Sequence, residues 1–161
     1  MHEQKHANGR DMYLRLAVMI GLSLIWMYAA MFAMVNVFQN VVQNINFVYM
    51  AVLMAGVMVP LEIVVMRAMY PDRRLNILAG VIGVLLIVAS FWAIRVQAGV
   101  GDDQFLASMI PHHAGAILMC EQAQLSDPEI RELCFGPNGI VESQQREIEQ
   151  MRTIIERLAG E

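Results

Sequence analysis

The residues best suited to chemistry in this sequence are two adjacent histidines with methionines before and after them. Met109, His112 and His113 lie within a Met-Ile-Pro-His-His motif, and Met119 follows further along the same stretch. Residues seven apart share a face of a helix, so His112 and Met119 share one face, while Met109, His113 and Cys120 share the next. Imidazole and thioether ligands together favour copper, and Cu(I) in particular, over zinc. The pattern therefore predicts a copper-binding helix.

A second helix is expected to complete this site. The stretch from about Ile140 to Leu158 has helical periodicity. If it folds back on the first helix as a hairpin, Gln144, Glu147 and Met151 come level with His113. Met151 would add a thioether, and the other two would close the site or hold the imidazoles in place. Paired histidines on a helix are also often solvated or supporting groups, so the spacing leaves both interpretations open.

Catalytic alternatives fit the segment after residue 98 less well. Neither Glu-x-x-His nor His-Glu-x-x-His occurs in residues 99–161, so the usual di-iron and zinc-protease arrangements lack their residues there. A Cys-His nucleophile pair is also unsuited, because His113 and Cys120 lie about 10 Å apart along one helix. We therefore expect a binding protein and not an enzyme.

The histidines need a folded domain around them, for which we assign residues 99–161. Gly99 and Gly101 mark a joint, Asp102 is a suitable N-cap, and residues 104–125 have a helical pattern. Pro128 follows Asp127 in the order typical of an N-cap and first helical position, which predicts a short helix to about residue 134. A Gly-Pro-Asn-Gly run then separates it from the last helix.

Two cysteines are placed to stabilise this small domain. Cys120 lies seven residues before Asp127 and Cys134 seven residues after it, so a hairpin turning there sets the thiols level. A disulfide would stabilise the domain by about 3 kcal/mol on the chain-entropy model. Free buried thiols, soft-metal ligands and a redox-active pair are the alternatives.

The chain before residue 99 is predicted to be a three-span membrane region. The protein is 57% hydrophobic and 16% charged, with a mean hydropathy of +0.48. Leu16–Phe38, Ile45–Met66 and Ile77–Ile94 are each long enough to cross a bilayer. A cleaved signal sequence is the alternative for the first, but 23 residues is long for one and no clear Ala-x-Ala site follows. The partner of this region is the lipid bilayer.

Charge sets the expected orientation and excludes one class of partner. Basic residues precede the first span and surround the loop between spans two and three: Lys5, Arg10, Arg15, Arg67, Arg73 and Arg74. By the positive-inside rule both regions are cytoplasmic, which places residues 99–161 in the periplasm if the membrane is a bacterial inner membrane. Residues 102–161 carry eleven acidic and four basic residues, so no nucleic-acid partner is expected.

Methionines also follow one another at four-residue spacing within the second span, at Met50, Met54 and Met58, with Glu62 next in the row. Methionine fills irregular helix contacts, so packing is one interpretation. A row of thioethers that contact soft metal ions is the other. Glu62 is either a functional intramembrane carboxylate or a partner of Arg67 or Arg15.

Three stretches carry a family resemblance: DDQFLASMIPHHAGAILMC, DPEIRELC and SQQREIEQM. Together they resemble the domain-of-unknown-function family number 305, and the methionine-rich spans resemble the membrane region that accompanies this domain in many bacterial proteins. The resemblance implies a ferritin-like helical fold and an association with periplasmic copper. It maps the family's signature histidines onto His112 and His113, its flanking methionines onto Met109 and Met119, and its closing motif onto Gln144, Glu147, Ile148 and Met151.

The resulting hypothesis is an all-α protein in which three transmembrane helices anchor a small antiparallel helical hairpin domain. That domain would bind Cu(I) for sequestration, transfer or tolerance. The alternative is a structural subunit that docks another membrane protein or a second copy of itself.

Overall fold

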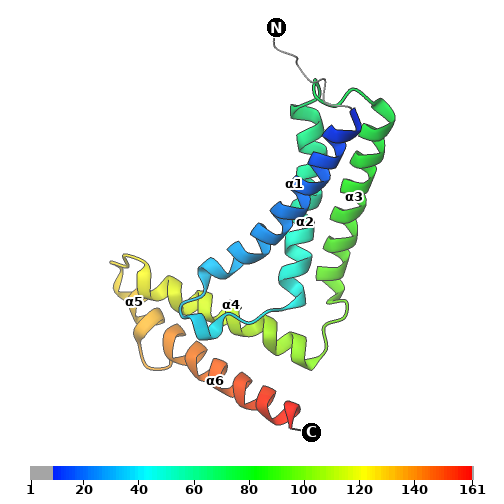
Figure 1. The fold of residues 1–161 in the computed structure, drawn as a ribbon. Coiled ribbons are helices and arrows are strands. Elements are labelled where there is room, and N and C mark those ends of the chain that lie inside the picture. Colours follow the sequence, from blue (N-terminus) through cyan, green and yellow to red (C-terminus); the bar gives the residue numbers. More distant parts are fainter. Residues whose placement is uncertain (1–8, 161) are drawn as a thin grey trace. The chain divides into compact units, whose positions relative to one another are not determined.

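The computed structural model describes residues 9–160, with side chains from residue 11 onward. In that range the regular structure is entirely helical, which confirms the all-α prediction. The elements in chain order are α1 (Gly9–Ala30), the short 3-10 helices η1 (Met31–Met34) and η2 (Phe38–Asn40), α2 (Ile45–Val65), α3 (Arg73–Val96), α4 (Asp102–Gln122), α5 (Pro128–Phe135) and α6 (Ile140–Ala159) (Figure 1).

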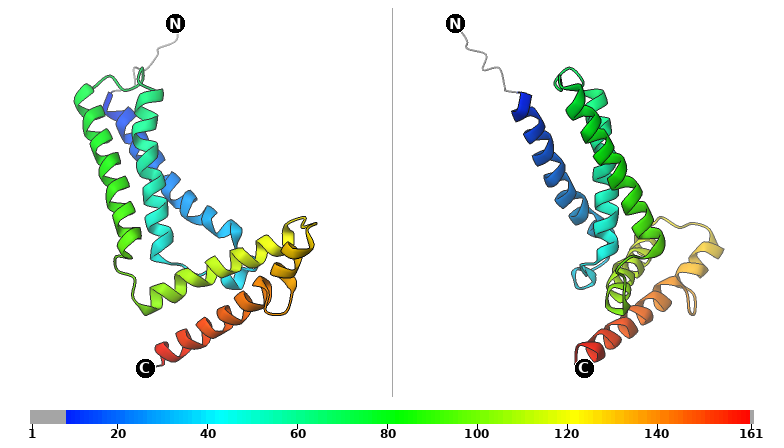
Figure 2. Two further views of the ribbon diagram at one scale, coloured as in Figure 1. Left: turned by 180° about the vertical axis from the view of Figure 1, so that it is seen from behind. Right: turned by 90° about the vertical axis from the view of Figure 1, so that its right-hand side faces the viewer.

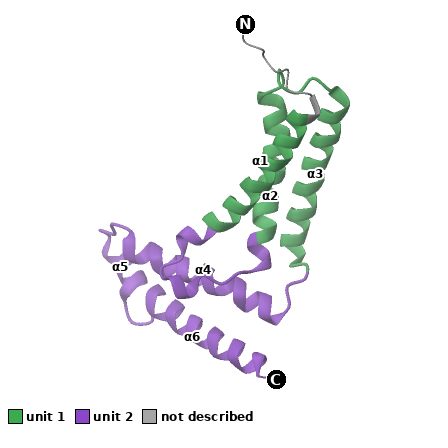
Figure 3. Cartoon of the chain, viewed as in Figure 1, with its two compact units in different colours: residues 1–30, 48–98 green, residues 31–47, 99–161 purple. Residues whose placement is uncertain are grey.

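The chain forms two compact units (Figure 3). The first contains the chain up to Ala30 together with Val48–Ala98, and the second contains Met31–Phe47 together with Gly99–Glu161. The second unit is therefore assembled from two segments that are separated in the sequence by most of α2 and all of α3.

Three helical stretches are long and apolar enough to cross a membrane, namely Asp11–Met34, Ile45–Val65 and Arg73–Val96. This agrees with the three predicted spans, but the first ends earlier as an α-helix. The sequence predicted an unbroken helix to Phe38, whereas α1 stops at Ala30 and gives way to η1. The physical reason is a tertiary contact. Both η1 and η2 pack against α4, and this packing ends the α-helix at Ala30.

Close backbone contact joins α2 to α3 in the first unit. A Cβ atom added to Gly83 would lie 2.9 Å from the Gly56 carbonyl oxygen and 2.9 Å from Cδ of Pro60. A Cβ on Gly56 would lie 3.1 Å from the Gly83 carbonyl oxygen. Only glycine at both positions lets the two helices approach this closely, which is a common device for packing helices in lipid.

The core of the second unit lies between α4 and α6, which run side by side (Figure 2). Its most deeply buried large side chains are Ile110 and Ile117 of α4 and Ile148 of α6. Leu106, Ala114 and Met151 complete the cluster. Burial of such aliphatic side chains contributes about 1.5–3 kcal/mol each, which makes this contact the main source of stability in the unit.

A disulfide between Cys120 and Cys134 joins the end of α4 to α5, with the two Cα atoms 5.6 Å apart. The side chain of Asp127 accepts hydrogen bonds from the backbone N–H groups of Glu129 and Ile130. This confirms the predicted N-cap of α5. The predicted N-cap of α4 was wrong by one residue: Gly101 occupies it without a side-chain bond. Asp102 instead lies in the first turn, where its negative charge interacts favourably with the positive end of the helix dipole.

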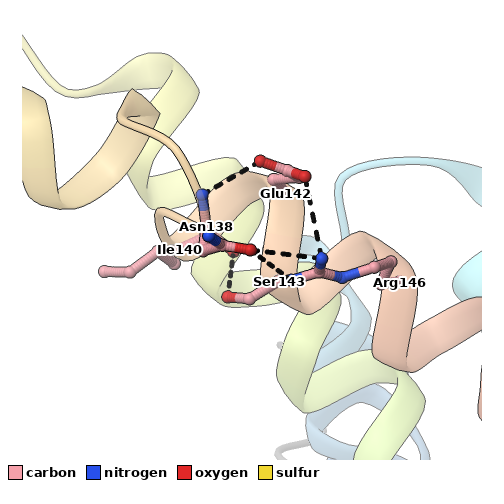
Figure 4. A network of polar contacts seen from close by, with 5 residues as sticks. All are labelled: Asn138, Ile140, Glu142, Ser143 and Arg146. Atoms are coloured by element: carbon pink, nitrogen blue, oxygen red, sulfur yellow. Dashed lines mark hydrogen bonds and ion pairs between the residues drawn. The ribbon is translucent and has the colours of Figure 1, made fainter.

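The Gly-Pro-Asn-Gly run forms the turn into α6, and Figure 4 shows how polar contacts hold it. Asn138 has a left-handed backbone with φ of 58°, and its N–H donates to Glu142 at 3.1 Å. The guanidinium of Arg146 donates to the Asn138 side-chain oxygen at 3.3 Å and lies 3.7 Å from the Glu142 carboxylate. These contacts fix the residue at which α6 begins.

The segment 31–47 is fastened to the rest of the second unit by polar groups. Arg152 of α6 donates to the Gln39 carbonyl and to the Asn40 side-chain oxygen, both at 2.7 Å. Asn40 is only 3% exposed, so this charge-assisted bond satisfies a group that would otherwise be costly to bury. The N–H of Ile45 donates to the Gln104 side chain of α4 at 2.9 Å.

The glycine contact between α2 and α3 predicts a position-specific effect. Gly83→Ala places a Cβ against backbone and should destabilise the first unit by about 1–3 kcal/mol. Gly80→Ala is the matched control, because nothing lies within 4 Å of a Cβ there, and it should be neutral or stabilising by up to about 1 kcal/mol. Thermal unfolding of both variants in detergent measures the difference, and equal midpoints would contradict the close approach.

The disulfide predicts a reductant-dependent loss of stability in the second unit. Reduction, or Cys120→Ser with Cys134→Ser, should lower the free energy of unfolding by about 3 kcal/mol. Chemical unfolding with and without reductant tests this, and the double variant should no longer respond to reductant. A wild-type protein that unfolds identically in both conditions would show that the bond contributes nothing.

Candidate functional site

His113 is the buried imidazole of the second unit. It lies on the face of α4 that is turned toward α6, and it is 7% exposed. Its Nδ1 is 2.9 Å from the Met109 carbonyl oxygen, and its Nε2 is 2.6 Å from a carboxylate oxygen of Glu147 on α6. Since a carbonyl oxygen only accepts, Nδ1 carries a proton, and a second proton lies between Nε2 and the Glu147 carboxylate. Of these two partners, only Glu147 is a side chain that can move away from the imidazole.

Two methionines accompany this contact. Met109 comes four residues before His113 on α4, and Met151 comes four residues after Glu147 on α6. Residues four apart lie one turn apart on the same face. Met151 is 8% exposed and belongs to the core cluster, against which Met109 packs. We call Met109, His113, Glu147 and Met151 the interhelical group.

The other expected ligands of the second unit lie outside this group. His112 is exposed, with its ring centroid 6.2 Å from that of His113. Met119 is 56% exposed, and Gln144 is half-buried on α6. The structure thus joins His113 to Glu147, with Met109 and Met151 one helical turn away on the same two helices, and leaves His112 and Met119 at the surface.

The membrane candidates occupy α2 of the first unit. Met50 is exposed, and Met54 and Met58 are half-buried. Met58 lines an open, largely apolar surface pocket of about 450 Å³ together with Met27 of α1. These positions leave the packing and metal-contact interpretations both open.

Glu62 is a hydrogen-bond partner of Tyr70, in the loop after α2. Burial raises the pKa of the Tyr70 phenol, and the charge of Glu62 and the hydrogen bond to it raise that pKa further. Because the folded state disfavours the phenolate, the stability of the fold falls as the pH rises from the ordinary tyrosine pKa through the raised one. The tilted ring of Tyr13 of α1 packs against that of Tyr70 with ring centroids 5.3 Å apart, so Glu62 joins a polar cluster at this end of α2.

Across residues 11–160, no three histidine, cysteine, aspartate or glutamate side chains converge as a metal cluster. One further motif lies elsewhere: His2, Glu3 and His6 have the His-Glu-x-x-His spacing, which the expectation of a non-enzyme did not weigh. Those residues fall outside the described range, so no role is assigned to them.

Comparison with known proteins places the chain in a family. Residues 89–155 match the family described as Domain of unknown function (DUF305). An uncharacterized protein of Acanthamoeba polyphaga mimivirus is 33% identical over 115 residues, which cover 70% of this chain and 72% of the viral protein. The chain belongs to the DUF305 family. No solved structure matches it.

The DUF305 match covers the end of α3, all of α4 and α5, and most of α6. It therefore contains the whole interhelical group, as the sequence resemblance had indicated. It does not contain the segment 31–47, although that segment packs against the same helices. No short motif marks these residues, and only the three-dimensional contact with α4 reveals them.

The His113–Glu147 contact predicts a stability effect that needs no metal. Glu147→Ala removes the partner of a buried imidazole nitrogen and should cost about 1–3 kcal/mol. Glu156→Ala, an exposed carboxylate on the same helix, should change stability by less than about 0.5 kcal/mol. Chemical unfolding of the metal-free protein compares the two. Equal effects would mean that the contact does not stabilise the unit.

Proposed function

We propose that this protein is a membrane-anchored binder of copper in the Cu(I) state, and that the interhelical group is its principal site. The observation that carries the proposal is a buried imidazole whose Nε2 faces a second helix, with one methionine a helical turn away on each of the two helices. Imidazole and thioether donors together favour Cu(I). The protein would hold or pass on the ion without transforming a substrate.

The hydrogen bonds of His113 suit it to be a ligand. Its Nδ1–H is held by the Met109 carbonyl, which is the arrangement that orients a metal-binding imidazole and leaves Nε2 for the ion. The Glu147 carboxylate is hydrogen-bonded to Nε2, but the Glu147 side chain is 52% exposed and can rotate into solvent. Met109 and Met151 would then supply sulfur from the two helices, with Gln144 and Glu147 closing the site.

Two observations support an extracytoplasmic position for the second unit. Its disulfide is typical of oxidising compartments. Its two segments are separated by two candidate spans, α2 and α3, and two crossings return a chain to the same side. With the basic residues of the cytoplasmic loops, this favours a cytoplasmic N-terminus and a periplasmic second unit in a bacterial inner membrane. The proposed domain type is a ferritin-like antiparallel helical hairpin.

The alternative is a structural or partner-binding membrane subunit. It is favoured by the apolar residues exposed on α5, since Ile130, Leu133 and Phe135 are 47%, 61% and 51% exposed. In that case the His113–Glu147 contact is only a polar link between two helices, and the partner is another membrane protein or a second copy of the chain.

A Cu(I) competition titration of the full chain in detergent separates the two functions. The reductant should be ascorbate, because a thiol would compete for copper and reduce the disulfide. The copper binder should take Cu(I) from a chromophoric chelator, and His113→Ala should weaken the binding at the interhelical group at least about tenfold. Met109→Leu and Met151→Leu should weaken it as well, because they keep the apolar packing and remove only sulfur.

Met69→Leu is the control, since Met69 lies outside the second unit and is 42% exposed. It should bind copper as the wild type does. Failure of the wild type to compete with a weak chelator, or equal affinity in His113→Ala, would favour the structural subunit.

A further inference from the structure

An open groove of about 350 Å³ runs along the first unit between α1 and α3. Its lining is almost entirely apolar, with Ile20 of α1 and Ile82 of α3 among the wall residues. Val59 of α2, which is only 4% exposed, forms its floor. Two of the wall residues, Ala17 of α1 and Ala79 of α3, have small side chains, and they leave space that larger side chains would fill. We call this feature the α1–α3 groove.

The α1–α3 groove covers about half the depth of a bilayer. Both helices run in the same direction from the end at which the Tyr13 hydroxyl donates to the Asp72 carbonyl at 3.1 Å and to the Asn76 side chain at 2.8 Å (Figure 1). The lining residues of α3 extend from Leu75 to Leu86, which is about 16 Å along the helix axis. One leaflet supplies about half of a hydrocarbon core that is about 30 Å thick. The groove therefore matches the length of one lipid acyl chain, and it is too short to follow a partner helix through the whole bilayer.

Two arginines lie at the end of the groove that Tyr13 closes. Arg73 and Arg74 are the first residues of α3, directly before Leu75 in the lining, and both are exposed. No described carboxylate forms an ion pair with either of them. Arginine places its guanidinium at the head-group level of a membrane while its stem covers apolar surface, and it binds phosphate oxygens through paired N–H donors. The chemistry at this end of the groove therefore suits a phosphate with negative charge.

We propose that the α1–α3 groove binds one acyl chain of an anionic phospholipid from the adjacent leaflet, and that Arg73 and Arg74 hold its phosphate. The bound chain fills the space between α1 and the other two helices of the first unit. This agrees with the burial of the three candidate spans, of which the first is the least buried. The proposal goes beyond copper binding and does not depend on it, because the interhelical group belongs to the second unit.

Native mass spectrometry of the full chain in detergent tests the head-group part of the proposal. The probes are phosphatidylglycerol and phosphatidylcholine with identical acyl chains. Wild type should bind one phosphatidylglycerol molecule about tenfold more tightly than phosphatidylcholine. Arg73→Gln with Arg74→Gln should lower the affinity for phosphatidylglycerol to that for phosphatidylcholine. Arg95→Gln is the control, because Arg95 is an exposed arginine at the other end of α3, and it should keep the preference.

A groove-filling variant tests the acyl-chain part. Ala17→Leu with Ala79→Leu places larger apolar side chains where the lipid chain would lie, so the affinity for both lipids should fall at least about tenfold. Ala89→Leu is the matched control, since Ala89 is exposed on α3 and does not line the groove. It should bind both lipids as wild type does. The thermal unfolding midpoint of the groove-filling variant without lipid should be no lower than that of wild type, because only apolar contacts are added.

Four outcomes would overturn the lipid site. The first is equal affinity of wild type for the two lipids, and the second is unchanged phosphatidylglycerol binding by the groove-filling variant. The third is loss of the preference in Arg95→Gln, which would show that binding follows total charge. The fourth is a wild-type dimer that the groove-filling variant dissociates, which would mean that a second copy of the chain occupies the groove. Each outcome leaves the Cu(I) titration unaffected, because its donors lie in the second unit.

Discussion

Packing of α4 against α6 is the contact on which the second unit depends. Ile110, Ile117 and Ile148 form a thin core, and units of this size usually need additional links. The disulfide supplies one link at the far end of α4. Arg152 supplies another by fastening the segment 31–47 to α6. The rest of the unit therefore serves to hold two helices at a fixed register.

The same interface holds the only described histidine that is buried. Its polar nitrogens are satisfied in the metal-free state by a carbonyl of its own helix and by the Glu147 carboxylate. An ion at Nε2 would replace that carboxylate contact with a stronger one and leave the packing of the isoleucines unchanged. The proposed copper site is thus compatible with a stable fold without metal, because the Glu147 side chain that would have to move is half in solvent.

Features that depend on local sequence were predictable. Asp127 caps α5 because its side chain reaches its own backbone, and α6 begins at Ile140 directly after the Gly-Pro-Asn-Gly turn. The end of α1 was not predictable, because nothing in the apolar run from Leu16 to Phe38 interrupts a helix. It is determined by contacts with α4, which lies about seventy residues later in the chain.

The candidate site was predictable in part for the same reason. Helical periodicity puts His112 and His113 on different faces of α4. Met109 shares the face of His113, and Met119 shares the face of His112. It does not say which of those faces is turned to α6, since that depends on the direction in which the last helix returns. The hydrogen bond from the Ile45 N–H to the Gln104 side chain of α4 likewise joins residues far apart in the chain, and no pattern within either segment encodes it.

The two-segment construction of the second unit also constrains how the protein is made. Arg152 contacts a carbonyl 113 residues earlier in the chain. At a synthesis rate of about 5–20 residues per second, the segment 31–47 emerges on the order of ten seconds before the helix that fastens it. During that interval the Gln39 carbonyl and the Asn40 side-chain oxygen lack the Arg152 guanidinium that donates to them in the folded unit. The second unit therefore cannot be completed until α6 has been synthesised.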